Sequence, residues 1–320
     1  MTTGVSIGAS ADALRVSYVA ETAYGTTPAT PSFSNLRVTS EGLVAADTFQ
    51  ESAELTPHGN VTDTFLTGSM AQGPIAFELT DGTFEAWLAA MLRSDWDGSP
   101  DDVLRNGIAP TSFTVEKTFT VGSSSLYQRF TGMIPNTMSL AFSAGEKVTG
   151  SFDLMGSAVS TATTAISGAT YTAANQERPL NGTSDFSGLA FMGLSPTPKI
   201  RSVNLSVQSN LREQRELGRL GPAGYGLGKF RVTAEMEIYF DSWTLYEAWR
   251  AQTAGGLSWR VGTEAGKRYD FEIGRGKLTN ATVTAGGENT DVMVNATYQG
   301  LYNQSGSPAE NCTLKITRNV

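Results

Sequence analysis

Apolar and polar side chains alternate over many short stretches of this chain. The pattern is clearest at residues 147–154, where every second side chain is apolar and the others are small or charged. A period of two predicts a β-strand with one buried face and one face in water. The pattern recurs at residues 203–208, 232–240 and 292–299. We therefore expect a mainly β protein built from antiparallel sheets.

One stretch with a different period predicts a short helix. Phe84, Trp87, Leu88 and Met91 stand at positions i, i+3, i+4 and i+7. One face of this helix is apolar, so we expect it to cover the apolar side of its sheet. The other face of the sheet then stays open to water.

The helix motif occurs twice in the chain. Residues 84–89 (FEAWLA) return as residues 246–251 (YEAWRA), and an alternating strand precedes each copy. Landmarks on both sides keep their order, and Gly132 corresponds in this way to Gly276. Such ordered self-similarity predicts one module written twice, with one short flanking helix in each copy. The first copy carries an insertion, which we place at residues 95–108 in a surface loop.

These landmarks divide the chain into five expected segments. The segment between the two modules is rich in threonine, serine and alanine, and we expect it to be a linker or a weakly paired hairpin. The tail contains one more alternating piece, a candidate strand for addition to a neighbour. The segments are an extended amino-terminal arm at 1–32 with at most one strand, a first module at 33–157, the linker at 158–190, a second module at 191–302 and a tail at 303–320.

Length and charge narrow the class of protein. A chain of 320 residues with 40% hydrophobic content is long enough for two domains with their own cores. The formal charge of −8 argues against a surface that grips nucleic acid by neutralising phosphates. It is compatible with a channel through which DNA slides without sticking.

The sequence also limits the compartment and the redox chemistry. No apolar run reaches the length of a membrane span, and residues 1–10 lack the features of a secretion signal. We therefore expect a protein that is made and used in a cytoplasm or released by lysis. The single cysteine, Cys312, excludes an internal disulfide and a cysteine-based zinc site.

No residue pattern predicts an active site. His58, the single histidine, stands in a turn-like stretch without a second metal ligand nearby. Residues 4–8 spell a hydrolase nucleophile pattern with no strand before it, and residues 218–228 lack the lysine and hydroxyl of a phosphate loop. Glu235 and Glu237 share a strand face that we interpret as a wet sheet surface rather than a catalytic pair. We expect no enzymatic activity, no metal and no cofactor.

Two long loops of the expected modules carry opposite charge. Residues 38–92 contain acidic residues but no lysine or arginine, whereas the charged residues within 199–231 are mainly basic. They are either solvated loops or complementary contacts between neighbouring copies. For the contacts between subunits we name Glu51, Glu54 and Asp63 on the acidic loop, and Arg212, Arg215 and Arg219 on the basic loop.

The chain resembles the major tail tube proteins of long-tailed, siphovirus-type bacteriophages, here with a duplicated tube module. Residues 18–28 (YVAETAYGTTP) carry this resemblance, together with the order of strands, long loop, strand and short helix in each copy. The resemblance implies a β-sandwich whose inner sheet joins neighbours into a barrel. It also implies stacked rings that form a hollow tube for DNA delivery. Because single-module relatives form hexameric rings, a duplicated chain should form a homo-trimeric, pseudo-hexameric ring.

The same resemblance gives the strand faces a location and the protein its partners. The partners are further copies of this chain and the tape-measure, tail-tip and tail-terminator proteins, with DNA passing non-specifically and no membrane insertion. The location is the virion tail, with assembly in the host bacterial cytoplasm. We expect the lumen to be lined by Lys147, Thr149, Ser151, Asp153, Asn204, Ser206, Gln208, Glu235, Glu237, Asn295, Thr297 and Gln299.

Two other classes of function remain open from the sequence. A phage decoration or host-surface-binding β-protein would also be acidic, rich in strands and short of catalytic residues, but it has little reason to keep a helix and a long loop in both copies. A carbohydrate-active enzyme needs convergent carboxylates and aromatic side chains in a cleft. Trp87 and Trp249 stand instead in equivalent helix positions, where we expect them to belong to the core.

Overall fold

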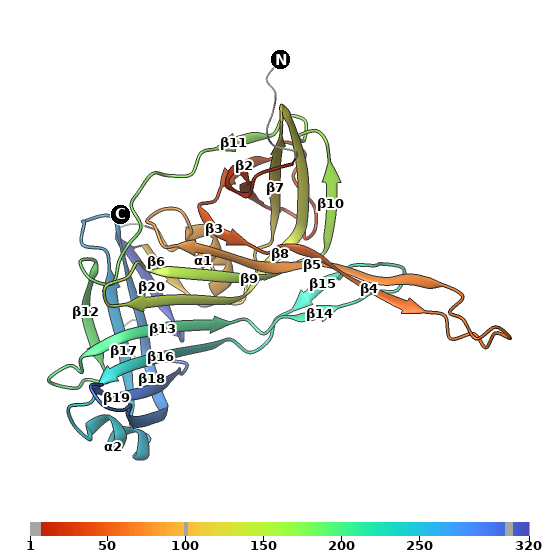
Figure 1. Cartoon of the computed structure of the whole chain (residues 1–320). Coiled ribbons are helices and arrows are strands. Elements are labelled where there is room, and N and C mark those ends of the chain that lie inside the picture. Colours follow the sequence, from red (N-terminus) through yellow and green to blue (C-terminus); the bar gives the residue numbers. More distant parts are fainter. Residues whose placement is uncertain (1–7, 99–101, 305–309, 320) are drawn as a thin grey trace.

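Long antiparallel strands dominate the computed structural model, which describes residues 8–98, 102–304 and 310–319. This confirms the prediction of a mainly β protein. The helices of the described residues are short and lie beside the sheets (Figure 1). They are η1 (Ala11–Ala13), α1 (Glu85–Leu92) and α2 (Thr244–Arg250).

One continuous antiparallel sheet, which we call the inner sheet, runs through both halves of the chain. The second halves of the long strands β8 and β18 belong to it, and β8 pairs directly with β13 to join the two halves of the chain. Across the sheet the order is β3 (Val38–Glu41) and β4 (Val44–Glu51), then β5 (Thr64–Glu78), β9 (Thr149–Met155), β8 (Ser124–Ser143), β13 (Ile200–Gln208), β16 (Arg231–Tyr239), β19 (Val292–Gly300) and β18 (Arg268–Ala285).

Two outer sheets use the first halves of β8 and β18. Gly132, at a φ of 70°, lies where β8 passes from one layer to the other, a backbone geometry that favours glycine. The first outer sheet contains β1 (Arg15–Ala20), β2 (Ser32–Asn35), β7 (Phe113–Val121), β10 (Ala158–Ala162) and β11 (Thr170–Thr172). The second contains β6 (Asp102–Arg105), β12 (Phe186–Phe191), β17 (Ala254–Val261) and β20 (Lys315–Asn319). A separate hairpin is formed by β14 (Arg212–Gln214) and β15 (Gly224–Gly226).

The two halves of the inner sheet have the same strand order. The first half reads β3/β4, β5, β9, β8 and the second reads β13, β16, β19, β18, with a helix after β5 and after β16. Even the register shifts agree, because one falls between Val38 and Ser40 opposite β5 and the other between Ile200 and Ser202 opposite β16. This shared order is the structural counterpart of the landmarks that recur in the sequence.

Helix α1 is packed into the core as its apolar spacing predicts. The rings of Phe84 and Phe77 are stacked with centroids 4.0 Å apart, and Trp87 stacks on Phe113 at 4.6 Å. Trp87 also meets the edge of Tyr18 on β1 at 5.3 Å. The first outer sheet therefore covers α1, which leaves Trp87 only 1% exposed.

Helix α2 occupies the equivalent place but is only partly covered. Leu245 is its buried residue, and Trp249 is half-buried with its indole N–H donating to the Thr279 carbonyl at 3.0 Å. Trp243, just before the helix, is 57% exposed. The expectation of a core position thus holds fully for Trp87 and only in part for Trp249.

Several connecting segments form more strand than the sequence predicts. The expected linker contains β10, β11 and most of β12, and β2 spans the boundary between the expected arm and the first module. The insertion at 95–108 and the expected tail supply β6 and β20, which pair with each other and, through β20, with β18 of the same chain. Burial of Leu104 and Ile316 explains why these strands form. Residues 1–7 and 305–309 of the arm and tail lie outside the described residues.

Candidate functional site

The polar residues that the sequence singled out share one face of the inner sheet. Their strand neighbours, such as Leu205 and Val207, are fully buried on the opposite face. Register places Glu235 between Asn204 and Thr297 on neighbouring strands. The face contains Lys147, Thr149, Ser151, Asp153, Asn204, Ser206, Gln208, Glu235, Glu237, Asn295, Thr297 and Gln299.

Ion pairs neutralise part of this polar face. Lys147 pairs with Glu78 of β5, and an Arg201 nitrogen lies 3.4 Å from a Glu237 oxygen. The sequence reasoning missed Glu78, although the alternation of β5 around Phe77 carries the signal. It also missed other small polar groups that the register places on the face, namely Ser139, Thr233 and Thr282.

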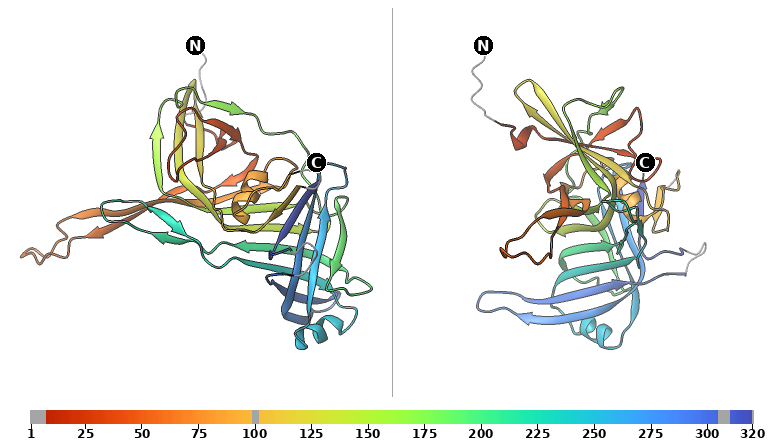
Figure 2. Two further views of the ribbon diagram at one scale, coloured as in Figure 1. Left: turned by 180° about the vertical axis from the view of Figure 1, so that it is seen from behind. Right: turned by 90° about the vertical axis from the view of Figure 1, so that its right-hand side faces the viewer.

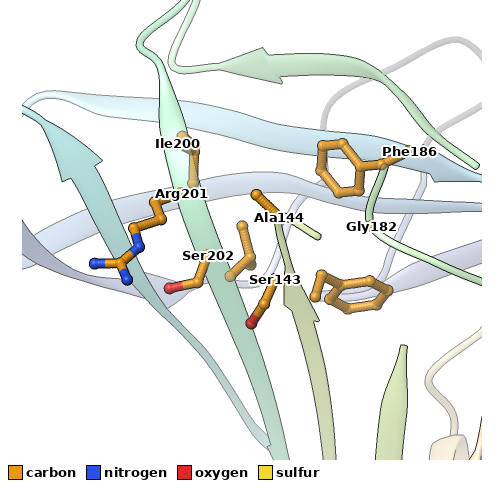
Figure 3. A pocket seen from close by; sticks show the side chains of 9 residues that line it. Ser143, Ala144, Gly182, Phe186, Ile200, Arg201 and Ser202 are labelled. Carbon is orange, nitrogen blue, oxygen red and sulfur yellow. The ribbon is translucent and has the colours of Figure 1, made fainter. Parts of the chain in front are cut away.

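Nothing on the described part of the chain forms a metal cluster, and the pocket in Figure 3 is small. No group of three metal-ligating side chains comes together there. The cavity between β8 and β13, lined by Ser143 and Ser202, has a volume of about 40 Å³ and could hold little more than a water molecule (Figure 3). His58 lies in an exposed turn, where its Nδ1 is 3.3 Å from Thr56 Oγ1. Among the described residues, no helix is long and apolar enough to cross a membrane.

The inner sheet has two edges that are unpaired within the described chain. Each edge strand has a counterpart in the other half of the sheet, and those two counterparts pair with each other. β3 pairs with β5 alone, whereas its counterpart β13 pairs with both β16 and β8. Residues 278–285 of β18 pair with β19 alone, whereas the counterpart half of β8 pairs with both β9 and β13. Each free edge therefore corresponds to a strand that is fully paired in the other half.

Hydrogen bonds show which way the backbone points at the β18 edge. Phe240 N donates to the Val292 carbonyl at 3.0 Å, so Val292 and, by alternation, Val294 turn their backbone groups toward β16. Val283, opposite Val294, must then turn its N–H and C=O to the free edge. Its counterpart Leu140 faces β13 in the same way. An unpaired row of this kind is a template for another strand.

A long arm projects from the sheet at the β4–β5 hairpin (Figures 1 and 2). Its acidic residues Glu51, Glu54 and Asp63 are exposed. The predicted basic residues lie on the β14–β15 hairpin beside the root of the arm, where Ser69 N donates to the Leu220 carbonyl at 3.1 Å. Contacts within the same chain already engage these residues: Arg212 donates to the Leu227 carbonyl, Arg215 pairs with Glu213, and Arg219 donates to Ser157.

Glu21 anchors the amino-terminal motif at residues 18–28. Its carboxylate accepts hydrogen bonds from Gly25 N and Gly132 N, each at 2.8 Å. It also accepts bonds from the hydroxyls of Ser112 at 2.7 Å and Thr114 at 2.8 Å. One carboxylate thus ties the loop after β1 to β7 and to the bend of β8.

We expect Glu21→Gln to destabilise the protein by about 2 kcal/mol, because an amide nitrogen replaces one acceptor oxygen and leaves donors unpaired. Chemical unfolding of the variant and the parent chain measures the difference. Glu51→Gln on the exposed arm is the matched control and should change stability by less than about 0.5 kcal/mol. Equal losses in the two variants would show that Glu21 is no anchor.

The start of α1 is fixed to the second outer sheet by an ionic network. Arg318 of β20 pairs with Glu85, and its Nε lies 2.8 Å from an Asp102 oxygen. The Arg318 guanidinium holds the pKa of Asp102 below its ordinary value. Gly82 N donates to Tyr269 Oη at 3.1 Å, and burial raises the pKa of this tyrosine. The first half of the chain therefore lies firmly on the second.

One family model matches the chain, and it extends over residues 12–300. Its description is phage tail tube protein. The match includes both halves of the inner sheet and both α-helices, α1 and α2. No curated protein gives a significant match to the chain.

Proposed function

Because the chain belongs to the phage tail tube protein family, we propose that it is the duplicated tube subunit of a siphovirus-type tail and assembles as a trimeric, pseudo-hexameric ring. Family membership makes it a structural protein of the virion tail. In our proposal the rings stack into a hollow tube through which DNA reaches the host. Contacts with tape-measure, tail-tip and tail-terminator proteins would set where the tube begins and ends.

This proposal rests on the correspondence of the two free edges, β18 and β3, to the strands β8 and β13, which pair with each other inside the chain. When β18 of one copy pairs with β3 of the next as β8 pairs with β13, the inner sheet continues from chain to chain. Ring closure then leaves no unpaired edge in the inner sheet. Closed symmetry with one repeated contact is the common form of a homo-oligomer. The same strand order in each half gives a ring of three chains six similar units.

In this ring the polar face of the inner sheet lines the lumen. Small hydroxyl and amide groups dominate it, and its two described ion pairs place Lys147 and Arg201 beside carboxylates. Arg231, opposite Gln208, and Lys277, opposite Gln299, share this face without a described carboxylate partner. Two such cations offer phosphates little to bind, so DNA passes without being held. The chain's formal charge of −8 supports the same reading.

The arm suits contacts between rings. It projects beyond the sheet (Figure 2), and Glu51, Glu54 and Asp63 are exposed at or beside the turn between β4 and β5. We propose that these carboxylates meet basic side chains of the β14–β15 hairpin on a neighbouring copy. Arg212 and Arg219 are better placed than Arg215, since their described bonds within the chain are to a carbonyl and a hydroxyl and not to a carboxylate.

Cysteine cross-linking tests the sheet continuation. Ser143 lies opposite Ser202 where β8 meets β13, and the equivalent pair between copies is Gly286 with Ser40. We expect a Ser40→Cys/Gly286→Cys chain to form disulfides between copies on mild oxidation, because opposed residues of such a pair come within disulfide reach. Denaturing electrophoresis should show covalent dimers and trimers.

The matched control for this experiment moves one cysteine along the strand. In Ser40→Cys/Thr282→Cys the second thiol lies about 13 Å further along β18, beyond disulfide reach. It should give monomers under the same conditions. Cross-linking in both variants, or in neither while the particles remain assembled, would contradict the proposed register.

A further inference from the structure

An open groove lies on the first outer sheet, at the end remote from the bend of β8. Phe119, Leu126 and Thr161 line it, and its volume is about 560 Å³. Leu126 is 41% exposed there. The residues that line the groove are apolar or uncharged polar, and none of them carries a charge. A ligand for this groove is therefore expected to be mainly apolar.

A second exposed apolar surface lies on α2. Trp243 is 57% exposed and Tyr246 is 37% exposed. Their rings meet edge to face at 5.6 Å, and Tyr246 meets Trp249 in the same way at 5.5 Å. This run of aromatic rings holds Trp243 and Tyr246 in place while both remain in contact with water.

The chain contains an internal template that joins two such surfaces. Phe119 and Leu126 are opposed on β7 and β8 as Val261 and Tyr269 are on β17 and β18. Tyr269 is fully buried because the start of α1 lies on it, with Gly82 N bonded to Tyr269 Oη. The groove is thus the counterpart of a site that a helix start fills within the same chain.

We propose that the start of α2 from a second copy of this chain fills the groove, with Trp243 and Thr244 seated over Leu126. By the repeated helix motif, Thr244 is the counterpart of Gly82. The inference rests on the proposed ring, since continuing the inner sheet repeats the relation that places α1 on Tyr269. The contact buries apolar area on both copies and lies outside the inner sheet.

The template also predicts how this contact differs from the internal one. Arg318, which pairs with Glu85 in the internal site, lies on β20 opposite Tyr269, and Thr163, just after β10, takes the equivalent position beside Leu126. Glu247 of α2 therefore has no cation at the template position. The contact between copies depends on the aromatic rings of α2 and so should tolerate salt better than an ionic contact.

Cross-linking at the counterparts of Gly82 and Tyr269 tests the proposal. We expect a short bismaleimide to join Leu126→Cys of one copy to Thr244→Cys of its neighbour in assembled particles, with a ladder that ends at three chains. A direct disulfide would not span the template distance, because Gly82 N meets the hydroxyl at the far end of the Tyr269 side chain. Cys312 should not compete, since it is buried and its pKa is raised to about 11 by that burial. A chain with Leu126→Cys/Glu288→Cys is the control and should remain monomeric on denaturing gels. A ladder that continues beyond three chains would place the contact between rings and overturn the proposal.

Assembly of groove variants gives an independent readout by sedimentation. Leu126→Asp buries a charge in the contact and should raise the concentration for half-assembly by roughly tenfold or more, whereas Leu126→Phe should stay near the parent value. Normal particle formation by Leu126→Asp, together with no bismaleimide cross-link in the Leu126→Cys/Thr244→Cys chain, would overturn this inference and leave the ring standing. A parent chain that forms no ring at all would overturn the proposed function and this contact with it.

Discussion

Val283→Pro should abolish assembly while leaving the single chain folded. The Val283 N–H points to the unpaired edge of β18, so proline removes a donor that only a neighbouring copy uses. Every chain in the ring carries the substitution, so every junction between β18 and β3 loses this hydrogen bond. The proline ring also prevents the two strands from packing closely there. We expect monomers in analytical ultracentrifugation at concentrations where the parent chain forms particles.

The control for this prediction is the adjacent residue. Thr282 lies opposite Asn295, and alternation turns its N–H to β19 inside the chain. Thr282→Pro should therefore lower the stability of the monomer by about 2 kcal/mol or more. Circular dichroism and chemical unfolding distinguish the two variants. A Val283→Pro chain that assembles like the parent would exclude β18 as a junction strand.

Trp87→Ala should cost about 3–5 kcal/mol of folding stability, as expected for a large side chain removed from a packed core. Trp87 is 1% exposed and packs on Phe113, Tyr18 and Phe152. Its indole nitrogen has no hydrogen-bond partner among the described residues, so the loss comes from packing. Chemical unfolding of the monomer, made in the Val283→Pro background, measures it without a contribution from assembly.

Trp249→Ala is the matched comparison because the two tryptophans are equivalent in the repeated motif. Trp249 is half-buried and donates one hydrogen bond to Thr279. We expect a loss of about 1–2 kcal/mol in the monomer. Equal losses for the two variants would contradict the difference in burial that separates α1 from α2.

The strand faces and the helix of the first half follow from local periodicity. Val203, Leu205 and Val207 alternate with polar residues, and a period of two determines which side chains share a face. The spacing of Phe84 and Trp87 fixes the buried side of α1 in the same way. These features depend only on residues that are close together in the sequence, and so they can be predicted from the sequence alone.

Long-range pairing explains what periodicity could not predict. The tail strand around Ile316 pairs with β6 and β18, which are far away in sequence. The expected arm contains Glu21, whose bonding partners Thr114 and Gly132 come from β7 and β8. Alternation also cannot tell whether a helix will be covered, and Trp249 remained half-exposed for that reason.

The bonding partners of the charged loop residues within the chain were the least predictable part of the site. Charge alone could not show that Arg215 has a carboxylate partner on its own hairpin. Nor could it show that Arg219 bonds to Ser157 at the root of the arm. Both depend on the path of the β14–β15 hairpin, which the sequence described only as a glycine-rich loop.

Electron microscopy of the purified, assembled protein tests the central claim most directly. Our account predicts hollow tubes of stacked rings with three chains in each ring. It also predicts that the inner wall is one continuous sheet, with β18 beside β3 of the next chain and Glu235 facing the lumen. A ring in which these two edges remain apart, or in which Leu205 faces the lumen, would contradict it.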